Sequence, residues 1–368
     1  MKFLSTTVLL SFILLFPSSS RAGEMEDGLL TLWESLWHQV GTPTLLNRWE
    51  GKVSYRYFGV NLELHRKHFE KILAQTSSHT GIIFEDISNQ SDAKEKARFH
   101  VEVVANNGDI PERLGCYVQH LKAPNFKLQE VELRMRDRDA YHCNLHEMMH
   151  AMGIVGHPSG DTVLTYFNQR ADKFLPLDEF LLQAWYSAAL LPGMTPFQTI
   201  DALSLAWVER FASSRLDARK VRQEFLEKIV GDSQRFADGT GEVPRILIRS
   251  GMLGPGSVAK AKIDMKWMLG ISYQYGHIVQ KDVVLAESWF ERAALEGSSP
   301  AMFFLGILNE QRAGTSQQAN ERAYYWYAVG DAYKHPACTA ARSRLLSKLS
   351  PEIIAKLDAE AAMFKLSN

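Results

Sequence analysis

The spacing of apolar residues predicts that helices and strands are mixed in the N-terminal half of the chain. Apolar side chains recur with helical spacing in residues 28–48, 61–74 and 144–152. They alternate with polar side chains, as strands do, in residues 49–59 and 131–136, and residues 81–84 and 99–104 are predicted to be further strands. Asn144 is the expected N-cap of the third helix, because its side chain can accept a hydrogen bond from a free backbone N–H group. One strand is thus expected to lead into this helix.

Helices dominate the rest of the chain, and its last third contains an internal repeat. Residues 177–230 have helical spacing, and glycine-rich stretches follow them. The dipeptide Leu-Gly at 269–270 recurs at 305–306, a period of 36 residues (305 − 269). Such a period is typical of stacked helix-turn-helix units, each of which buries its apolar face against the next. A last helix over residues 350–364 is expected to cap the stack.

The repeat has a family likeness. Residues 286–297, with the sequence AESWFERAALEG, resemble the Sel-like repeats, which are relatives of the tetratricopeptide repeats. The second copy is weaker, since Gly330 and Asp331 stand where the family has paired alanines. The resemblance covers about residues 259–368. It implies an all-α helix-turn-helix repeat domain that contacts a protein partner.

Composition indicates a globular protein, and the N-terminus indicates export. The formal net charge is −1, so no nucleic-acid partner is expected. Lys2 precedes an apolar run over residues 8–16, and small residues suit signal-peptidase cleavage between Ala22 and Gly23. We therefore expect a cleaved signal peptide, a periplasmic or secreted protein and no membrane span after cleavage. An uncleaved membrane anchor is the alternative.

The chain has three cysteines. In an oxidising compartment Cys116 and Cys143 could form a disulfide, or both could stay free, since the sequence does not show their separation. Cys338 lies in an alanine-rich helical stretch and is expected to be a small buried apolar residue.

The strongest chemical signal is the segment HEMMHAMGIVGH, which begins at His146. Histidines four positions apart lie on one face of a helix, so His146 and His150 can share a zinc ion. Glu147 beside them can accept a proton from a zinc-activated water, the general-base role in peptide hydrolysis. Gly153 allows a sharp, left-handed exit from the helix, which can bring His157 back as a third ligand. The alternative is that these histidines belong to the core.

This segment resembles the signature HExxHxxGxxH of the metzincins, a zincin-type group of zinc metallopeptidases. The resemblance implies an α+β domain with a mixed sheet and an active-site helix. His157 comes one residue later than the family's third histidine, and Gly156 stands in that place. Asp161 is the alternative third ligand, and His142 is a more remote one.

Metzincins also have a methionine-containing turn beneath the metal. The stretch TVLTY at residues 162–166 resembles it, with Leu164 in place of the methionine. The resemblance implies that Tyr166 could stabilise the oxyanion of the reaction intermediate. A plain buried tyrosine is the alternative.

Residues 45–205 also resemble a domain of unknown function from exported bacterial proteins that is grouped with the zincin-type peptidases. The resemblance rests on WEGKVSY from residue 49, LDEFLLQAWY from residue 177 and LLPGM from residue 190. Many members of that family have a degraded zinc motif, whereas this sequence keeps a full one. The expected organisation is a signal peptide (1–22), a metzincin-like zinc peptidase domain (23–213), a helical linker (214–258) and the repeat domain (259–368).

Two functions compete at this point. The first is an exported Zn²⁺-dependent metallopeptidase that hydrolyses a peptide or protein substrate, with the repeats docking the substrate or a partner. The second is an inactive zincin-like scaffold that acts as an adaptor in the cell envelope. An amidase of cell-wall peptides would use the same zinc chemistry as the first.

Overall fold

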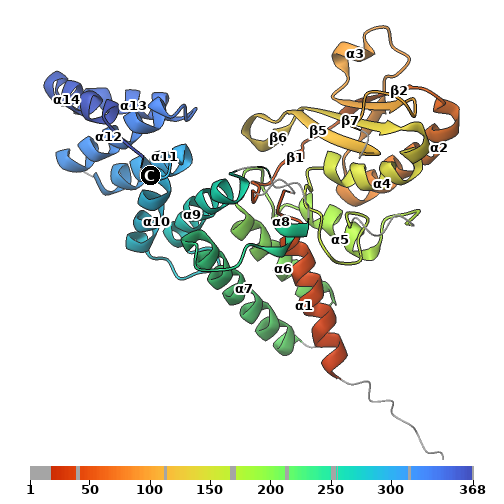
Figure 1. Cartoon of the computed structure of the whole chain (residues 1–368), viewed down its shortest axis with the longest axis horizontal. Coiled ribbons are helices and arrows are strands. Elements are labelled where there is room, and N and C mark those ends of the chain that lie inside the picture. The colour runs from red at the N-terminus through yellow and green to blue at the C-terminus, as the bar shows by residue number, and fades with distance from the viewer. Residues whose placement is uncertain are drawn as a thin grey trace, which may run out of the picture.

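The computed structural model describes residues 18–38, 42–111, 114–165, 171–211, 215–249, 254, 256–313 and 316–366. Figure 1 shows a sheet with its helices, a bundle of long helices below it and a curved array of helices at the C-terminal end. The fold is therefore mixed α/β with an all-helical C-terminal region. In the part of the chain that the structure describes, no helix is long and apolar enough to cross a membrane. The apolar run at 8–16 lies outside that part.

A five-stranded sheet has the strand order β3-β2-β4-β7-β5. Its strands are β2 (Val53–Gly59), β3 (Phe84–Asp86), β4 (Phe99–Val104), β5 (Cys116–Lys122) and β7 (Glu130–Arg136). All neighbours pair in parallel except β5, which runs antiparallel to β7 at one edge. The sheet is thus mixed, as predicted. A separate parallel pair joins β1 (Arg48–Trp49) to β6 (Lys127–Leu128).

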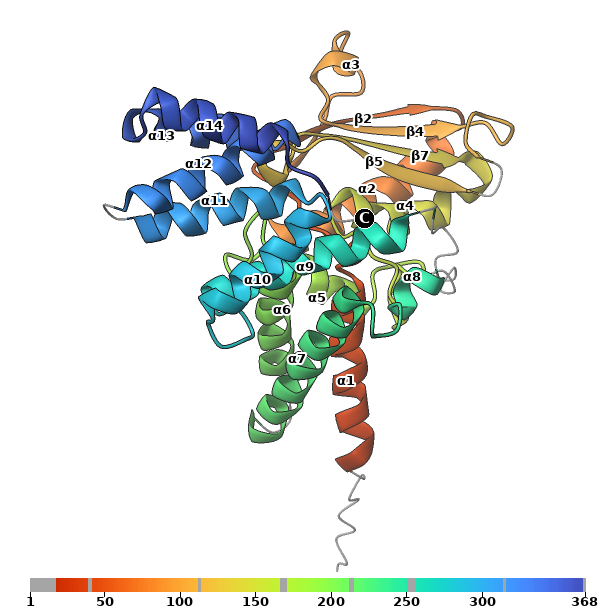
Figure 2. The ribbon, with the colours of Figure 1, turned by 60° about the vertical axis from the view of Figure 1, so that its left-hand side comes forward.

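Helices α2 (Leu62–Thr80) and α4 (Ala140–Ala151) lie on one side of the sheet, and the short α3 (Ala93–Lys96) lies on the other (Figure 2). The side facing α2 and α4 is apolar: Tyr57 of β2, for example, stacks on Phe69 of α2 with ring centroids 4.8 Å apart. The opposite side carries polar pairs such as Arg134 with Glu102, whose Nε and Oε2 atoms are 2.7 Å apart. This alternation is what buries one face of each strand.

Two predicted elements have wrong bounds. The helix predicted over 28–48 ends at Glu34, the last residue of α1 (Ser18–Glu34), and Trp37 then forms an isolated antiparallel bridge with Pro43. The strand predicted over 81–84 begins only at Phe84, because α2 continues to Thr80 and ends at a left-handed Gly81 with φ of 72°. The end of α2 is thus set by a local glycine cap, whereas the chain after α1 is held by the bridge from Trp37.

The histidine-bearing helix begins earlier than predicted. A short 3-10 turn, η2 (Asp137–Asp139), links β7 to α4, and Asp139 takes the N-cap position. Asn144 lies in the second turn of α4 and is fully buried, so its predicted capping role is wrong. The stretch that precedes it has no apolar periodicity, and it is helical because its buried residues, such as Ala140, pack in the core.

A bundle of α1, α6 (Pro196–Phe211) and α7 (Arg215–Asp238) lies below the sheet (Figure 1). Gly28 of α1 faces Trp207 of α6, and a Cβ atom at Gly28 would lie 2.3 Å from that indole. Glycine therefore lets the two helices approach closely. The stretch 214–258, predicted as a helical linker, contains α7 and α8 (Arg245–Arg249), and α7 also contacts the first repeat helix.

The C-terminal region is a stack of helices, as the repeat predicts. The helices are α9 (Ser257–Tyr275), α10 (Val283–Leu295), α11 (Ser299–Ala313), α12 (Gln317–Ala332), α13 (Cys338–Leu345) and α14 (Pro351–Ala362). Gly270 and Gly306 occupy equivalent positions in successive repeats, and each leaves room for an aromatic ring of the next helix. A Cβ at Gly270 would lie 2.5 Å from the Phe290 ring, and one at Gly306 would lie 2.2 Å from the Tyr327 ring. Cys338 is fully buried, as expected.

Candidate metal centre

Three histidine side chains converge on one point. The Nε2 atoms of His146, His150 and His157 are each 3.1 Å from the other two. These three residues form the one group of metal-ligating type within the described residues. Asp161 and His142 do not belong to it, so the structure brings His157 to the position of a third ligand.

Hydrogen bonds at the other ring nitrogen, Nδ1, orient the rings of His146 and His150. Nδ1 of His146 lies 2.8 Å from the Val163 carbonyl oxygen, and Nδ1 of His150 lies 2.7 Å from that of Ile154. A carbonyl oxygen only accepts hydrogen bonds, so each Nδ1 carries the proton. In the neutral rings the Nε2 atoms are then unprotonated and present lone pairs to each other. Three lone pairs directed at one point could be satisfied by a bound cation.

The electrostatics favour the neutral rings. Burial lowers the pKa of His146. Burial and the neighbouring charges of His157 and His146 hold the pKa of His150 well below its usual value. Burial lowers the pKa of His157 to about 3. At neutral pH all three side chains are therefore free of the second proton that would repel a metal ion.

The triangle has the size that zinc requires. With sides of 3.1 Å, the centre of the triangle is about 1.8 Å from each nitrogen, so a point somewhat outside the plane of the three nitrogens lies at the usual zinc–nitrogen distance of about 2.0–2.1 Å from all of them. Three neutral imidazoles with a nearby carboxyl group are also a typical donor set for catalytic zinc. The residues present thus fit this metal.

Glu147 lies on the same helix turn as the ligands. Its side chain is 5% exposed. Burial raises the pKa of this carboxyl group to about 8. The divalent cation that the three histidines could hold would favour the carboxylate form of this group.

A tight turn contacts the ring of His146. Thr165 N donates to the Thr162 oxygen over 3.3 Å, and the Val163 carbonyl between them accepts from His146. Leu164 in this turn is fully buried. The resemblance predicted Tyr166 as an oxyanion-stabilising residue, and that residue lies outside the described residues.

A buried aspartate holds this turn. Asp178, in the first turn of α5 (Pro176–Trp185), accepts hydrogen bonds from the Thr162 hydroxyl and from Val163 N, at 3.1 Å for its Oδ2. It also accepts one from Leu175 N, at 2.9 Å. Asp178 is 0% exposed, and burial raises its pKa to about 6. Sequence reasoning had no signal for this role, because Asp178 is 28 positions from His150 (178 − 150) and only the fold joins them.

Distant segments also shape the exit from α4, the helix that carries His146 and His150. Gly153 has φ of +97°, as its predicted left-handed exit requires, and a Cβ there would lie 2.1 Å from the Asn47 carbonyl oxygen. The Trp49 indole donates to the Ala151 oxygen over 2.8 Å, and the Tyr186 hydroxyl donates to the Met152 oxygen over 2.9 Å. These donors satisfy carbonyl groups that the end of α4 leaves without helical partners.

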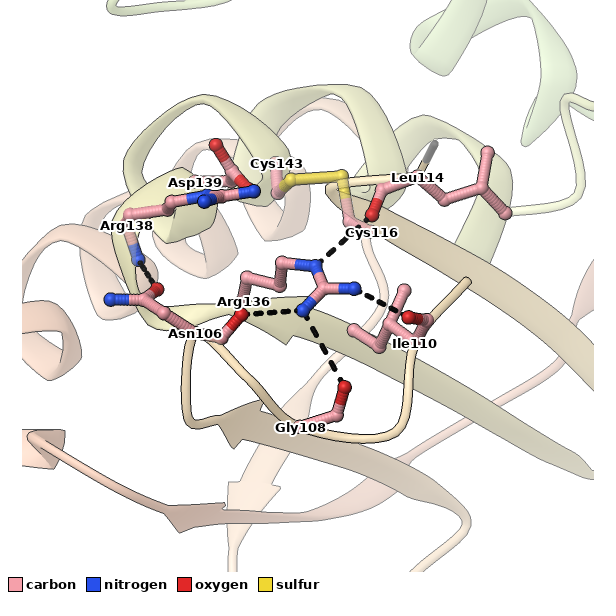
Figure 3. A network of polar contacts seen from close by, with 9 residues as sticks. All are labelled: Asn106, Gly108, Ile110, Leu114, Cys116, Arg136, Arg138, Asp139 and Cys143. Atoms are coloured by element: carbon pink, nitrogen blue, oxygen red, sulfur yellow. Dashed lines mark hydrogen bonds and ion pairs between the residues drawn. A yellow bond between two sulfur atoms is a disulfide. The ribbon is translucent and has the colours of Figure 1, made fainter. Parts of the chain in front are cut away.

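A disulfide joins the edge strand to this helix, and a buried arginine holds the connection that leads into that strand (Figure 3). Cys116 of β5 is bonded to Cys143 of α4, with their Cα atoms 6.0 Å apart. Arg136 is 5% exposed and donates to carbonyl oxygens of the β4–β5 connection: those of Asn106 (2.6 Å), Gly108, Ile110 and Leu114. The edge of the sheet beside the histidines is therefore tightly held.

Two further histidines near the site escaped the sequence analysis. Nε2 of His120, on β5, lies 2.8 Å from the His150 carbonyl oxygen. His38 follows α1, and its charge contributes to lowering the pKa values of His150 and His157. Neither residue is part of a motif, and β5 was not among the predicted strands, so only the tertiary structure reveals their proximity.

Comparison with known proteins identifies the C-terminal repeats. The Sel1 repeat family matches residues 264–298 and 299–328. These two matches confirm the predicted Sel-like repeats and suggest contact with protein partners. Among curated proteins, none matches the chain significantly. The matched residues do not include the histidine cluster, so its chemistry is argued from geometry.

Proposed function

We propose that the chain is an exported zinc-dependent metallopeptidase. The observation that carries this proposal is the convergence of three imidazole nitrogens, 3.1 Å apart, beside a buried glutamate. His146, His150 and His157 would hold the ion, and three protein ligands leave a position for water, as catalytic zinc sites do. Zinc in such a site acidifies water and polarises a carbonyl group.

Glu147 is the residue that moves the proton. It would accept one from the attacking water and return it to the leaving amine of the cleaved peptide. Burial raises the pKa of this carboxyl group, so once it is ionised beside the bound cation it is a stronger base than an exposed glutamate. The exported character rests on the N-terminal apolar run and the small residues before Gly23.

The test begins with metal content. The chain from Gly23 onward should bind about one zinc ion, measured by plasma mass spectrometry, and a His146→Ala control should lose it. Glu147→Gln should keep the zinc but cleave a peptide library at least about 100-fold more slowly, because it retains the shape and loses the base. Hydrolysis by Glu147→Gln at the wild-type rate would remove Glu147 from the mechanism.

The Sel1 repeats favour a second function, the docking of a protein partner. Under this proposal residues 264–328 bind the partner, with or without hydrolysis at the histidine cluster. Capture of the same partners by wild type and by a folded His150→Ala variant would favour a pure adaptor. Cleavage of a captured protein by wild type alone would join the two functions.

A further inference from the structure

The third ligand has a support different from that of the other two. His146 and His150 project from α4, which packs on the sheet, whereas His157 lies in the loop that follows Gly153. This loop reaches the site with one residue more than the metzincin spacing. Contacts from outside this loop are therefore needed to hold His157 beside the other two rings.

The end of α1 provides that support. Oε2 of Glu34 accepts hydrogen bonds from both the backbone N and the hydroxyl of Ser159, each over 2.7 Å. Gly156 N donates to the Ser35 carbonyl oxygen over 3.1 Å. These bonds flank His157 on both sides. Glu34 is 6% exposed and Ser35 is 0% exposed, so the contacts are shielded from water and are stronger than surface pairs.

The same contacts explain the glycines of the loop. A Cβ at Gly156 would lie 2.4 Å from the Glu34 carbonyl oxygen, and one at Gly160 would lie 2.2 Å from the Thr31 hydroxyl. The loop thus lies directly against the α1 backbone and has no room for side chains there. Glycine at these positions is a packing requirement as well as a source of flexibility.

We infer that Glu34 and Ser35, at the end of α1, are positioning residues that hold His157 in the metal site. The inference rests on the proposed metal site and goes further, because it makes a helix of the α1–α6–α7 bundle part of that site. Metal binding would then link the sheet to the bundle, because His146 and His150 come from α4, which packs on the sheet, and the end of α1 holds the third ligand. Loss of a contact that orients a metal ligand typically lowers metal affinity by about 10–100-fold.

The experiment measures zinc affinity by competition with a chromophoric chelator. Glu34→Gln should weaken zinc binding about 10-fold, and Gly156→Ala should weaken it at least as much. Glu26→Gln, an exposed position on the same helix, is the matched control and should bind as wild type does. The visible spectrum of the cobalt-loaded proteins should change for Glu34→Gln toward that of His157→Ala, and circular dichroism of the metal-free proteins checks that each variant is folded.

The outcomes separate the two proposals. Wild-type zinc affinity and an unchanged cobalt spectrum in Glu34→Gln would overturn the positioning role and leave the metal site standing. A lower melting temperature with unchanged affinity would do the same, since it would show a purely structural contact. A wild-type protein that binds no zinc would overturn both the metal site and the support for it.

Discussion

The buried carboxyl group of Asp178 should make the stability of the metal-free protein depend on pH. Its pKa is raised by burial from 3.8 to about 6, although Thr162, Leu175 and Val163 donate hydrogen bonds that lower it. A raised folded-state pKa means that the folded state binds the proton more tightly than the unfolded state. The stability from this group is present below pH 3.8 and is lost as the pH rises to about 6.

The magnitude follows from the shift. A difference of about 2 pKa units corresponds to about 3 kcal/mol of unfolding free energy, of which about 2 kcal/mol is lost between pH 4.5 and pH 7.5. Asp178→Asn has nearly the same shape and does not titrate. The stability difference between wild type and Asp178→Asn should therefore move by about 2 kcal/mol in favour of the variant over this range.

Urea unfolding of both metal-free proteins, at several pH values across this range, measures that difference. The comparison removes the contribution of the buried histidines, whose lowered pKa values act in the opposite direction and are common to both proteins. A stability difference that stays constant within about 0.5 kcal/mol would refute the reasoning. It would show that the hydrogen bonds from the turn outweigh burial and keep Asp178 ionised.

Two further predictions concern residues that support the histidine-bearing helix α4. Gly153→Ala should lower the unfolding free energy by about 2 kcal/mol or more and weaken zinc binding, because its Cβ would lie 2.1 Å from the Asn47 oxygen at φ of +97°. Wild-type values in denaturant titration and chelator competition would contradict this prediction. Replacing both Cys116 and Cys143 by serine should lower the unfolding free energy by roughly 3–4 kcal/mol, since the disulfide closes a loop with a sequence separation of 27. Urea unfolding with and without reductant measures this loss, and an equal unfolding midpoint for the oxidised wild type and the double variant would argue against a formed disulfide.

The local pattern was sufficient where the chemistry itself is local. His146 and His150 share a helix face because four residues make about one turn, so the sequence alone placed both and Glu147 beside them. The Leu-Gly period of 36 residues likewise predicted the stacked helices, because each unit repeats the same packing problem. The alternation of the strands predicted the sheet for the same reason, since a strand buries every second side chain.

Tertiary structure decided everything that depends on residues distant in the chain. It placed His157 through contacts with Glu34 and Ser35, and it fixed the turn beneath His146 through Asp178. It also began α4 at Ala140 instead of Asn144, and it paired β7 with β5, a strand that was not predicted. No spacing rule predicts such contacts, because their energy comes from burial and hydrogen bonds that form only once the sheet and the bundle have packed together.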